Sequence, residues 1–468
     1  MIDHTQTRHI QALRLISAIS GLAAILYWFH VFGTLSWDGN DLRRDFVTYY
    51  APALGLRMGI NPYSINGGQL YQQTLNVENP PPEVFEGHIG DTPTWLMFIE
   101  SLTHLSLKTA YWVFTASSFL FLATSLALLS HESQLGPPEV WLVASLMILY
   151  PPIAPTFWHG KGDLQLLFLF VLIGRFLTRG SDTLAGITLG FAGALRGYPF
   201  GLCAYLVACR RWRALAAALV SAFVLLGVTT LVVGRNVTFT YFAQTSLLKN
   251  GGGLLTDVAP LLQPIGWAHH PSNLNLGWFV KFAFDHVFGT GVGPMRQLMR
   301  GVCAVLGEVI LVAAAFLATN GATKDRDAIW RHLSLWIVTI TMISPLFWSD
   351  FLDCFVVFFV ILAGALSRRR APLAAVWIAV AAYISAVISA IVRTPRVTEF
   401  LRANLLPQHL HVFNQFAELL FLSVVLTWIS AYWFVRASAM PSPVPARTRR
   451  GEEPSVDFSA LARDAFRG

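Results

Sequence analysis

Residues 45–63 hold the densest group of side chains able to do chemistry in this chain. The stretch carries the carboxylate of Asp45, the phenols of Tyr49 and Tyr63, and a Gly-x-Asn-Pro-Tyr sequence at its end. It follows shortly after the first apolar segment and lies in an otherwise hydrophobic sequence. Ionisable residues at membrane depth are costly and usually functional. This polar, aromatic-rich loop next to an apolar segment is therefore a candidate rim of an active site.

Three further polar clusters interrupt the apolar sequence, and each supplies side chains able to contact a substrate. They are a Gly-Lys-Gly-Asp turn with Lys161 and Asp163, Arg196 before Gly-Tyr-Pro, and a Ser-Pro-Leu-Phe-Trp-Ser-Asp run with Trp348 and Asp350. If the apolar segments cross a membrane in alternation, all these clusters reach the same face as Asp45. A carboxylate and cations facing one cavity suit a reaction in which a hydroxyl loses its proton while a phosphate leaves.

Each cluster also has a purely structural interpretation. Asp45 could cap the N-terminus of a helix, because aspartate accepts hydrogen bonds from free backbone N–H groups there. Arg196 could extend its charged end to lipid headgroups, and headgroup contact is the simpler interpretation of Lys161 in a glycine turn. His269 and His270 have no third ligand at a suggestive spacing, so no metal site is predicted, although a divalent metal requirement stays open.

The composition is that of a polytopic membrane protein. Of 468 residues, 54% are apolar and only 13% are charged, whereas a soluble domain has roughly 25% charged residues. The four cysteines lie in apolar runs without metal-binding spacing, which favours buried, inert thiols. The net charge of +7 is typical of arginine and lysine in cytoplasmic loops and does not indicate a nucleic-acid partner.

The hydropathy pattern predicts an all-α bundle of about twelve membrane spans, with both termini in the cytoplasm. The expected spans are 11–33, 108–130, 140–157, 163–178, 184–195, 198–209, 212–233, 297–318, 332–349, 351–367, 371–392 and 413–436. They form one domain, residues 1–436, followed by a Pro-, Ser- and charge-rich cytoplasmic tail at 437–468 that we expect to be disordered.

Two large outer loops, 34–92 and 234–296, connect these spans. In the first, apolar residues between Phe46 and Met58 recur at helical spacing and predict an amphipathic helix on the membrane surface, kinked or shortened by Pro52. Residues 93–106 are apolar but short, so we expect a partial or re-entrant segment there.

Several of these sequences occur in the order seen in one known family. Asp45-Phe46-x-x-Tyr49-Tyr50 and Gly59-x-Asn61-Pro62-Tyr63 resemble the first outer-loop motif of glycosyltransferase family 87, in the GT-C superfamily. Gly-Lys-Gly-Asp at 160–163 is similar to the family's Gly-Gln-x-Asn. The Ala-Gly pair at 185–186, the Arg-Gly-Tyr-Pro and Arg-Arg-Trp sequences that follow it, and Ser344-Pro345-x-x-Trp348 also have counterparts in the family. The resemblance spans roughly residues 10–370.

The resemblance implies an inverting, mannosyltransferase-like enzyme of the cytoplasmic (inner) membrane, active on its outer, periplasmic face. It implies a sugar carried on a polyprenyl phosphate as donor, mannose being the first expectation, and a glycolipid or glycan acceptor. Asp45 would then be the general base, and Arg196 would hold the donor phosphate. The substrate site would also include Lys161, Asp163, Tyr49, Tyr63, Trp348 and Asp350. Lys161, Asp163 and Asp350 replace the family's glutamine, asparagine and histidine, respectively.

A transporter or flippase of lipid-linked sugars is the competing class. Such proteins often have two similar halves with helices broken near the membrane midplane. Here the outer loops are long and unequal and no matching second half is evident, which favours an enzyme. A nucleotide-linked donor would need a cytoplasmic phosphate-binding loop, and the sequence has none. The predicted function is therefore transfer of a lipid-linked sugar, without a redox cofactor.

Overall fold

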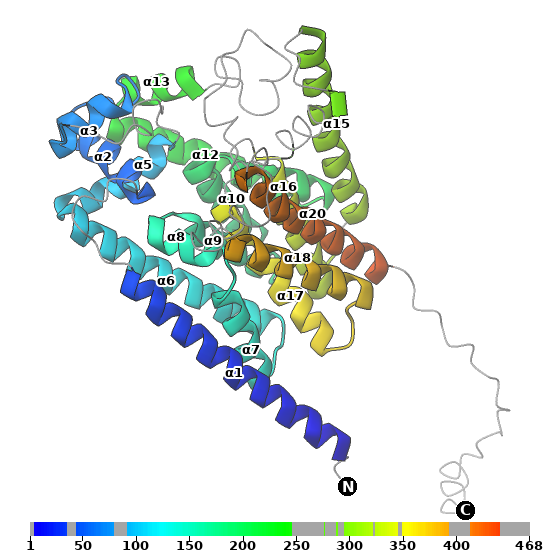
Figure 1. Ribbon diagram of the computed structural model, residues 1–468. Coiled ribbons are helices and arrows are strands. Elements are labelled where there is room, and N and C mark those ends of the chain that lie inside the picture. Colours follow the sequence, from blue (N-terminus) through cyan, green and yellow to red (C-terminus); the bar gives the residue numbers. More distant parts are fainter. Residues whose placement is uncertain are drawn as a thin grey trace, which may run out of the picture.

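The computed structural model describes residues 4–34, 44–78, 91–245, 276, 287–288, 294–321, 323–344, 349–392 and 412–439. Within these residues every regular element is a helix (Figure 1), as the all-α prediction requires. Most of the second outer loop, both histidines 269 and 270, and residues 440–468 of the expected tail lie outside the described residues, whereas 437–439 belong to the last helix.

The helices occur close to the predicted places. They are α1 (His4–Thr34), α2 (Asp45–Arg57), α3 (Gly67–Leu75), α5 (Pro93–Glu100), α6 (Leu107–Glu132), α7 (Pro137–Ile148), α8 (Ile153–His159), α9 (Asp163–Thr178), α10 (Asp182–Arg196), α11 (Leu202–Ala208), α12 (Trp212–Val233), α13 (Arg235–Thr245), α15 (Pro294–Thr319), α16 (Arg326–Met342), α17 (Val356–Ser367), α18 (Leu373–Val392) and α20 (Val412–Ala439). Among the described residues, short 3-10 helices join them at η1 (Ser101–His104), η2 (Tyr198–Gly201) and η4 (Ser349–Phe355).

Five of the described helices are long and apolar enough to cross a membrane: 11–31 within α1, then α6, α12, α18, and 419–438 within α20. A sixth span results if α7 and α8, which meet at a bend of 55°, form one broken span. Three of the other predicted spans are helical but short, since α9, α10 and α16 have 16, 15 and 17 residues. The helix α15 has 26 residues, of which 305–319 form a shorter apolar segment. A crossing needs about 20 residues, so twelve crossings stays a prediction.

Two predicted segments differ in shape from a straight span. The segment expected at 140–157 is broken at Pro151-Pro152, where consecutive prolines remove backbone N–H donors and end α7. Residues 93–106 form only α5 and η1, in line with the partial segment that was predicted.

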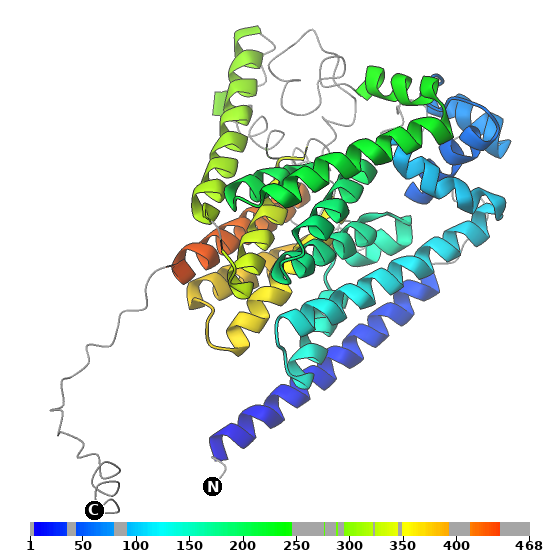
Figure 2. The same ribbon diagram turned by 180° about the vertical axis from the view of Figure 1, so that it is seen from behind.

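The helices of the bundle meet at two opposite ends. We call the end where α2 begins the Asp45 end, and the end where α6 finishes the Glu132 end. At the Asp45 end the short helices α2, α3, α5 and α13 gather, and α1 runs from there alongside α6 and α7 to its distant N-terminus (Figures 1 and 2). Hydrogen bonds tie the turns of the Glu132 end together, including Gly321 N–H to the Ala208 carbonyl (3.0 Å) and Arg326 to the Glu132 carbonyl (2.8 Å).

The outside of the long helices is strongly apolar. Phe223 and Leu231 on α12 are 79% and 86% exposed, and such a surface needs lipid to cover it. At the Glu132 end, exposed tryptophans stand near the ends of four helices: Trp141, Trp212, Trp377 and Trp433. Tryptophan at this depth is typical of the boundary between hydrocarbon and headgroups.

The helix predicted around 46–58 forms, but its predicted location on the membrane surface is wrong. Most of α2, including Phe46, Tyr49 and Tyr50, is buried against protein. Its rings pack on one another and on α5 and α6, with Phe46 contacting Phe114 (5.2 Å between ring centroids) and Tyr49 contacting Trp95 (5.7 Å). Because both aromatic and small residues find protein partners, α2 belongs to the core. Pro52 lies inside the helix without shortening it.

The cysteines are all free, as predicted, but they are not all buried. Cys209 and Cys354 are buried, Cys203 is half-buried and Cys303 is exposed. Cys303 lies in α15, whose apolar side chains Val309 and Ile310 are also exposed. The prediction of a buried thiol is therefore wrong at Cys303, because an apolar sequence does not distinguish a lipid-facing position from a buried one.

Glycines allow α10 and α12 to approach at backbone distance. A Cβ added at Gly186 would lie 2.1 Å from the Ala214 carbonyl oxygen, and one at Gly190 would lie 2.0 Å from Ser221 Oγ and 2.4 Å from the Ala218 carbonyl oxygen. This is a small-xxx-small contact of the kind that drives helix association in membranes. It fixes the axis of α10, and therefore the position of Arg196 at its end.

We expect Gly190→Leu to lower the unfolding temperature in detergent, with a cost of about 3 kcal/mol from overpacking. Gly227→Leu on α12 is the matched control, because a Cβ there meets no atom within 4 Å. Equal unfolding temperatures for the two variants in a fluorescence-detected melting experiment would contradict this packing.

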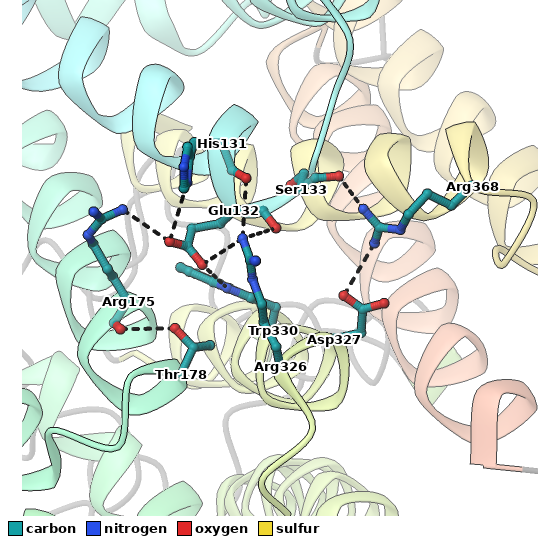
Figure 3. A network of polar contacts seen from close by, with 9 residues as sticks. All are labelled: His131, Glu132, Ser133, Arg175, Thr178, Arg326, Asp327, Trp330 and Arg368. Atoms are coloured by element: carbon teal, nitrogen blue, oxygen red, sulfur yellow. Dashed lines mark hydrogen bonds and ion pairs between the residues drawn. The ribbon is translucent and has the colours of Figure 1, made fainter.

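Glu132 organises the opposite end of the bundle (Figure 3). Its carboxylate is 5% exposed and accepts from Arg175 of α9 (3.0 Å), Arg326 of α16 (3.1 Å) and the indole N–H of Trp330 (3.4 Å). Beside it, Arg368 donates to the Ser133 carbonyl and pairs with Asp327 (3.3 Å). The two arginines balance the charge of the buried carboxylate, and the carboxylate balances theirs. Without this pairing, burial of any of these charges would be costly.

Glu132→Gln should therefore destabilise the bundle by about 3 kcal/mol, because two partly buried arginines lose their shared counter-charge. The measurement is thermal unfolding of the purified protein in detergent. Glu139→Gln, on the half-buried Glu139 of α7 at the same end, should leave the midpoint unchanged. If the Glu132→Gln protein unfolds at the same temperature as the Glu139→Gln control, the network contributes no net stability.

Candidate functional site

Asp45 forms an ion pair with Lys161. Lys161 Nζ lies 2.8 Å from Asp45 Oδ2, and the two side chains are 15% and 32% exposed. Asp45 is the first residue of α2, the preceding Arg44 is the N-cap, and no side chain makes a capping bond there. The capping interpretation of Asp45 is therefore wrong, and so is headgroup contact for Lys161. The pair leaves a carboxylate that is one-third exposed and reachable from outside.

The glycines around Lys161 let its turn fit between aromatic residues. Gly160 has a positive φ of +70°, and a Cβ there would lie 2.8 Å from Phe46 Cβ. A Cβ on Gly162 would lie 2.6 Å from the Trp95 ring. Only glycine has both the required backbone conformation and the required lack of volume. The two glycines thus allow the turn to pack closely against α2 and α5, and this packing places Lys161 next to Asp45.

Arg196 is enclosed by protein. Its Nη1 lies 3.0 Å from Asp91 Oδ1, its Nη2 donates to the Tyr49 hydroxyl at 2.7 Å, and its side chain is 17% exposed. The guanidinium carbon lies 5.1 Å from the ring centre of Tyr49 and 5.3 Å from that of Trp95, within the range of cation–π attraction. The interpretation in which Arg196 extends to lipid headgroups is wrong.

Hydrogen bonds hold the backbone next to Asp91 in place. Tyr63 donates its hydroxyl to the Asp91 carbonyl at 2.6 Å. The Thr92 hydroxyl donates to the carbonyls of Ala194 and Leu195 (3.0 and 2.9 Å) and accepts from Trp95 N–H, which makes Thr92 the N-cap of α5. Burial raises the pKa of Asp91, and the Arg196 guanidinium opposes that rise. Burial also raises the pKa of Tyr49, so its phenol remains protonated.

One face of α2 joins these two ion pairs. Asp45 and Tyr49 are four residues apart, a spacing that places their Cβ atoms about 5–6 Å apart on the same side of a helix. Asp45 holds Lys161, and Tyr49 holds Arg196, which in turn holds Asp91. The structure therefore brings together a partly exposed carboxylate and two cations.

The other predicted site residues have different outcomes. Asp163 is fully buried at the start of α9, close enough to Arg196 and Tyr49 for electrostatic interaction. Tyr63 is buried and reaches the site through Asp91. Trp348 lies outside the described residues, and of Asp350 only the backbone is described, within η4.

Sequence reasoning missed three residues that build the site: Asp91, Trp95 and Arg44. Asp91 and Trp95 flank a Thr-Pro pair, the signature of a helix start with Thr92 as N-cap and Pro93 in the first turn. That signature predicts that the helix at Pro93 begins at a defined position, with the Asp91 carboxylate just before it. Arg44 is 1% exposed, and its guanidinium lies over the rings of Tyr111 (4.9 Å) and Trp158 (5.2 Å). Only the fold reveals these rings.

Among the residues that the structure describes, no group of three or more His, Cys, Asp and Glu side chains is placed to share a metal ion. The expectation that no cofactor is needed stays a prediction, because a substrate phosphate supplies ligands of its own.

Comparison with known proteins identifies the family. The model of glycosyltransferase family 87 matches residues 92–345, more than half of the chain. The chain belongs to glycosyltransferase family 87. This family 87 match includes Lys161, Asp163 and Arg196, whereas the Asp45, Tyr49 and Tyr63 motif precedes it and Trp348 and Asp350 follow it.

A curated relative is the polyprenol-phosphate-mannose-dependent alpha-(1-2)-phosphatidylinositol pentamannoside mannosyltransferase of Mycolicibacterium smegmatis. The family 87 chain described here is 27% identical to it over 231 residues, which cover 46% of this chain and 50% of the relative. The match thus spans about half the length of that protein. No solved structure matches this chain.

A double-mutant cycle tests the ion pair at the site. We expect Lys161→Met to lower the unfolding temperature less when Asp45→Asn is already present, with a coupling free energy of about 1 kcal/mol for a partly exposed pair. Thermal unfolding of the four proteins in one detergent measures it. Additive effects of the two substitutions would mean that the pair does not persist in solution.

Proposed function

We propose that this protein transfers a sugar from a polyprenyl-phosphate donor to a hydroxyl of a glycolipid or glycan acceptor, with inversion at the anomeric carbon. The observation that carries the proposal is the Asp45–Lys161 pair, which joins a reachable carboxylate to a cation on one face of α2. The family supports glycosyl transfer. The name of the mycobacterial relative, a polyprenol-phosphate-mannose-dependent enzyme, favours mannose and a glycolipid acceptor.

In this reaction the acceptor oxygen attacks the anomeric carbon while Asp45 takes the acceptor's proton. The bond between the anomeric carbon and the phosphate oxygen breaks, and its electron pair leaves with the polyprenyl phosphate. The phosphate therefore gains one negative charge, which Lys161 and Arg196 would stabilise. Tyr49, Tyr63, Asp163, Trp348 and Asp350 are proposed to complete the substrate site around these groups.

The distribution of arginine supports an outer location for the site. The Glu132 end carries a concentration of arginine in its turns: Arg175, Arg179, Arg210, Arg211, Arg213, Arg326, Arg368, Arg369 and Arg370. Short loops rich in arginine remain in the cytoplasm. The Asp45 end would then face the periplasm, where a lipid-linked donor enters from the membrane without a soluble nucleotide.

The test is release of polyprenyl phosphate by the purified, detergent-solubilised protein, offered a panel of polyprenyl-phosphate sugars and membrane glycolipids. We expect one donor to be consumed and Asp45→Asn to reduce its turnover by about 100-fold or more, the usual contribution of a general base. Glu78→Gln changes an exposed acid in the same outer segment and is the matched control.

Full activity of a folded Asp45→Asn protein would exclude Asp45 as the base. If the wild-type protein binds polyprenyl-phosphate sugars but consumes none, the activity is transport or binding of lipid-linked sugars, since a transferase works in detergent without any gradient.

A further inference from the structure

Asp91 occupies the side of Arg196 from which a phosphate would approach. The two η nitrogens of Arg196 contact Asp91 and the Tyr49 hydroxyl, and aromatic rings lie over its guanidinium. With 17% of the side chain exposed, little of the guanidinium is open to a ligand. Among the described residues, Nε of Arg196 is buried and has no hydrogen-bonding partner. An anion arriving from outside would therefore reach the η nitrogens first and compete there with Asp91 and the Tyr49 hydroxyl.

A carboxylate and a phosphate are equivalent partners for a guanidinium. Both present two oxygens in the geometry of the arginine N–H groups, and both form charge-assisted hydrogen bonds. Of the two η partners, Asp91 carries the charge, whereas Tyr49 is a neutral phenol. Asp91 is therefore the partner that a phosphate anion would replace.

The Asp91 side chain is able to leave without unfolding its surroundings. Its carboxylate has a single hydrogen-bonding and ion-pair partner among the described residues, Arg196. Its backbone is fixed independently by Tyr63 and by the bonds of Thr92 to α10. A change of the Asp91 rotamer would thus open the Nη1 edge of Arg196 while α5 and α10 stay in place.

We infer that Asp91 holds the place of the donor phosphate on Arg196 and is exchanged for that phosphate when the donor binds. The inference rests on the proposed function, because it assumes a phosphate-bearing lipid as ligand. Asp91 then competes with the donor phosphate for Arg196, and it keeps the buried guanidinium paired while no donor is bound. An unpaired arginine at this depth would be costly, and the exchange keeps it paired in both states.

Equilibrium binding of decaprenyl monophosphate to the full-length protein in detergent micelles tests the exchange at fixed pH and salt. Asp91→Asn keeps an oxygen that accepts from Arg196 but removes the competing charge. We expect it to bind this probe about tenfold or more tightly than wild type, because close charge pairs are strongly coupled and the competing charge is gone. Decaprenol, which lacks the phosphate, should bind both proteins equally.

Asp182→Asn is the matched control, because Asp182 pairs with Arg211 at 2.7 Å at the opposite end of the bundle. Its affinity for the probe should equal that of wild type. Asp91→Ser provides a second variant if Asp91→Asn does not fold, and Arg196→Gln should lose the phosphate-dependent binding.

Each outcome separates the exchange from the proposed function. If wild type binds the probe and folded Asp91→Asn or Asp91→Ser binds it equally or more weakly, Asp91 only positions Arg196 and the exchange is wrong. If no folded protein, including wild type, distinguishes decaprenyl monophosphate from decaprenol, the lipid-phosphate donor itself is wrong.

Discussion

The arrangement of the site depends on the burial of one positive charge. Arg196 stands at the end of α10, pairs with Asp91 before α5, and donates to Tyr49 of α2. A desolvated guanidinium is stable only if it is paired and hydrogen-bonded. Since its partners come from two other segments, the 91–100 segment with α5 and the helix α2, satisfying Arg196 requires α2, α5 and α10 to meet. The aromatic rings of Tyr49 and Trp95 add attraction and exclude water from the same contact.

The opposite end of the bundle obeys the same constraint with the signs reversed. There a buried carboxylate, Glu132, is surrounded by Arg175 and Arg326, and it draws α6, α9 and α16 together. Between the two ends, contacts such as Gly190 on Ser221 need no charge at all. Charged anchors thus lie at both ends of the helices, and the middle is held by close packing. This division fits a chain whose central part is surrounded by hydrocarbon.

Much of the helical layout could be predicted because hydrophobic periodicity and length act locally. The positions of α6, α9, α10, α12 and α18 follow from apolar runs ending at glycine or a charged residue. Burial of α2 could not be predicted, because an aromatic helix suits lipid and a protein core equally well. Its true partners, among them Phe114 and Trp95, are distant in sequence.

The candidate site was predictable in part for the same reason. Asp45, Lys161 and Arg196 stand out as charges in an apolar sequence, and alternation of the spans places them at one end. Their pairing was not predictable, since it depends on Gly160 and Gly162 fitting against Phe46 and Trp95. Asp91 was missed because an acid before a Thr-Pro helix start is common in exposed loops. Its importance arises only from the contact with Arg196.

The departures from the family pattern redistribute charge within the site. A lysine for glutamine at 161 adds one positive charge beside Asp45, and an aspartate for asparagine at 163 adds one negative charge near Arg196. These two changes leave the sum unaltered. In the proposed reaction, Asp45 becomes neutral when it takes the acceptor's proton, and the ammonium of Lys161 then loses the negative charge of its Asp45 partner. The departing phosphate gains a negative charge in the same step. The ammonium of Lys161 would then attract this phosphate in place of the Asp45 carboxylate. A neutral glutamine carries no charge to share in this way, so in the proposed reaction Lys161 would couple deprotonation of the acceptor to departure of the phosphate.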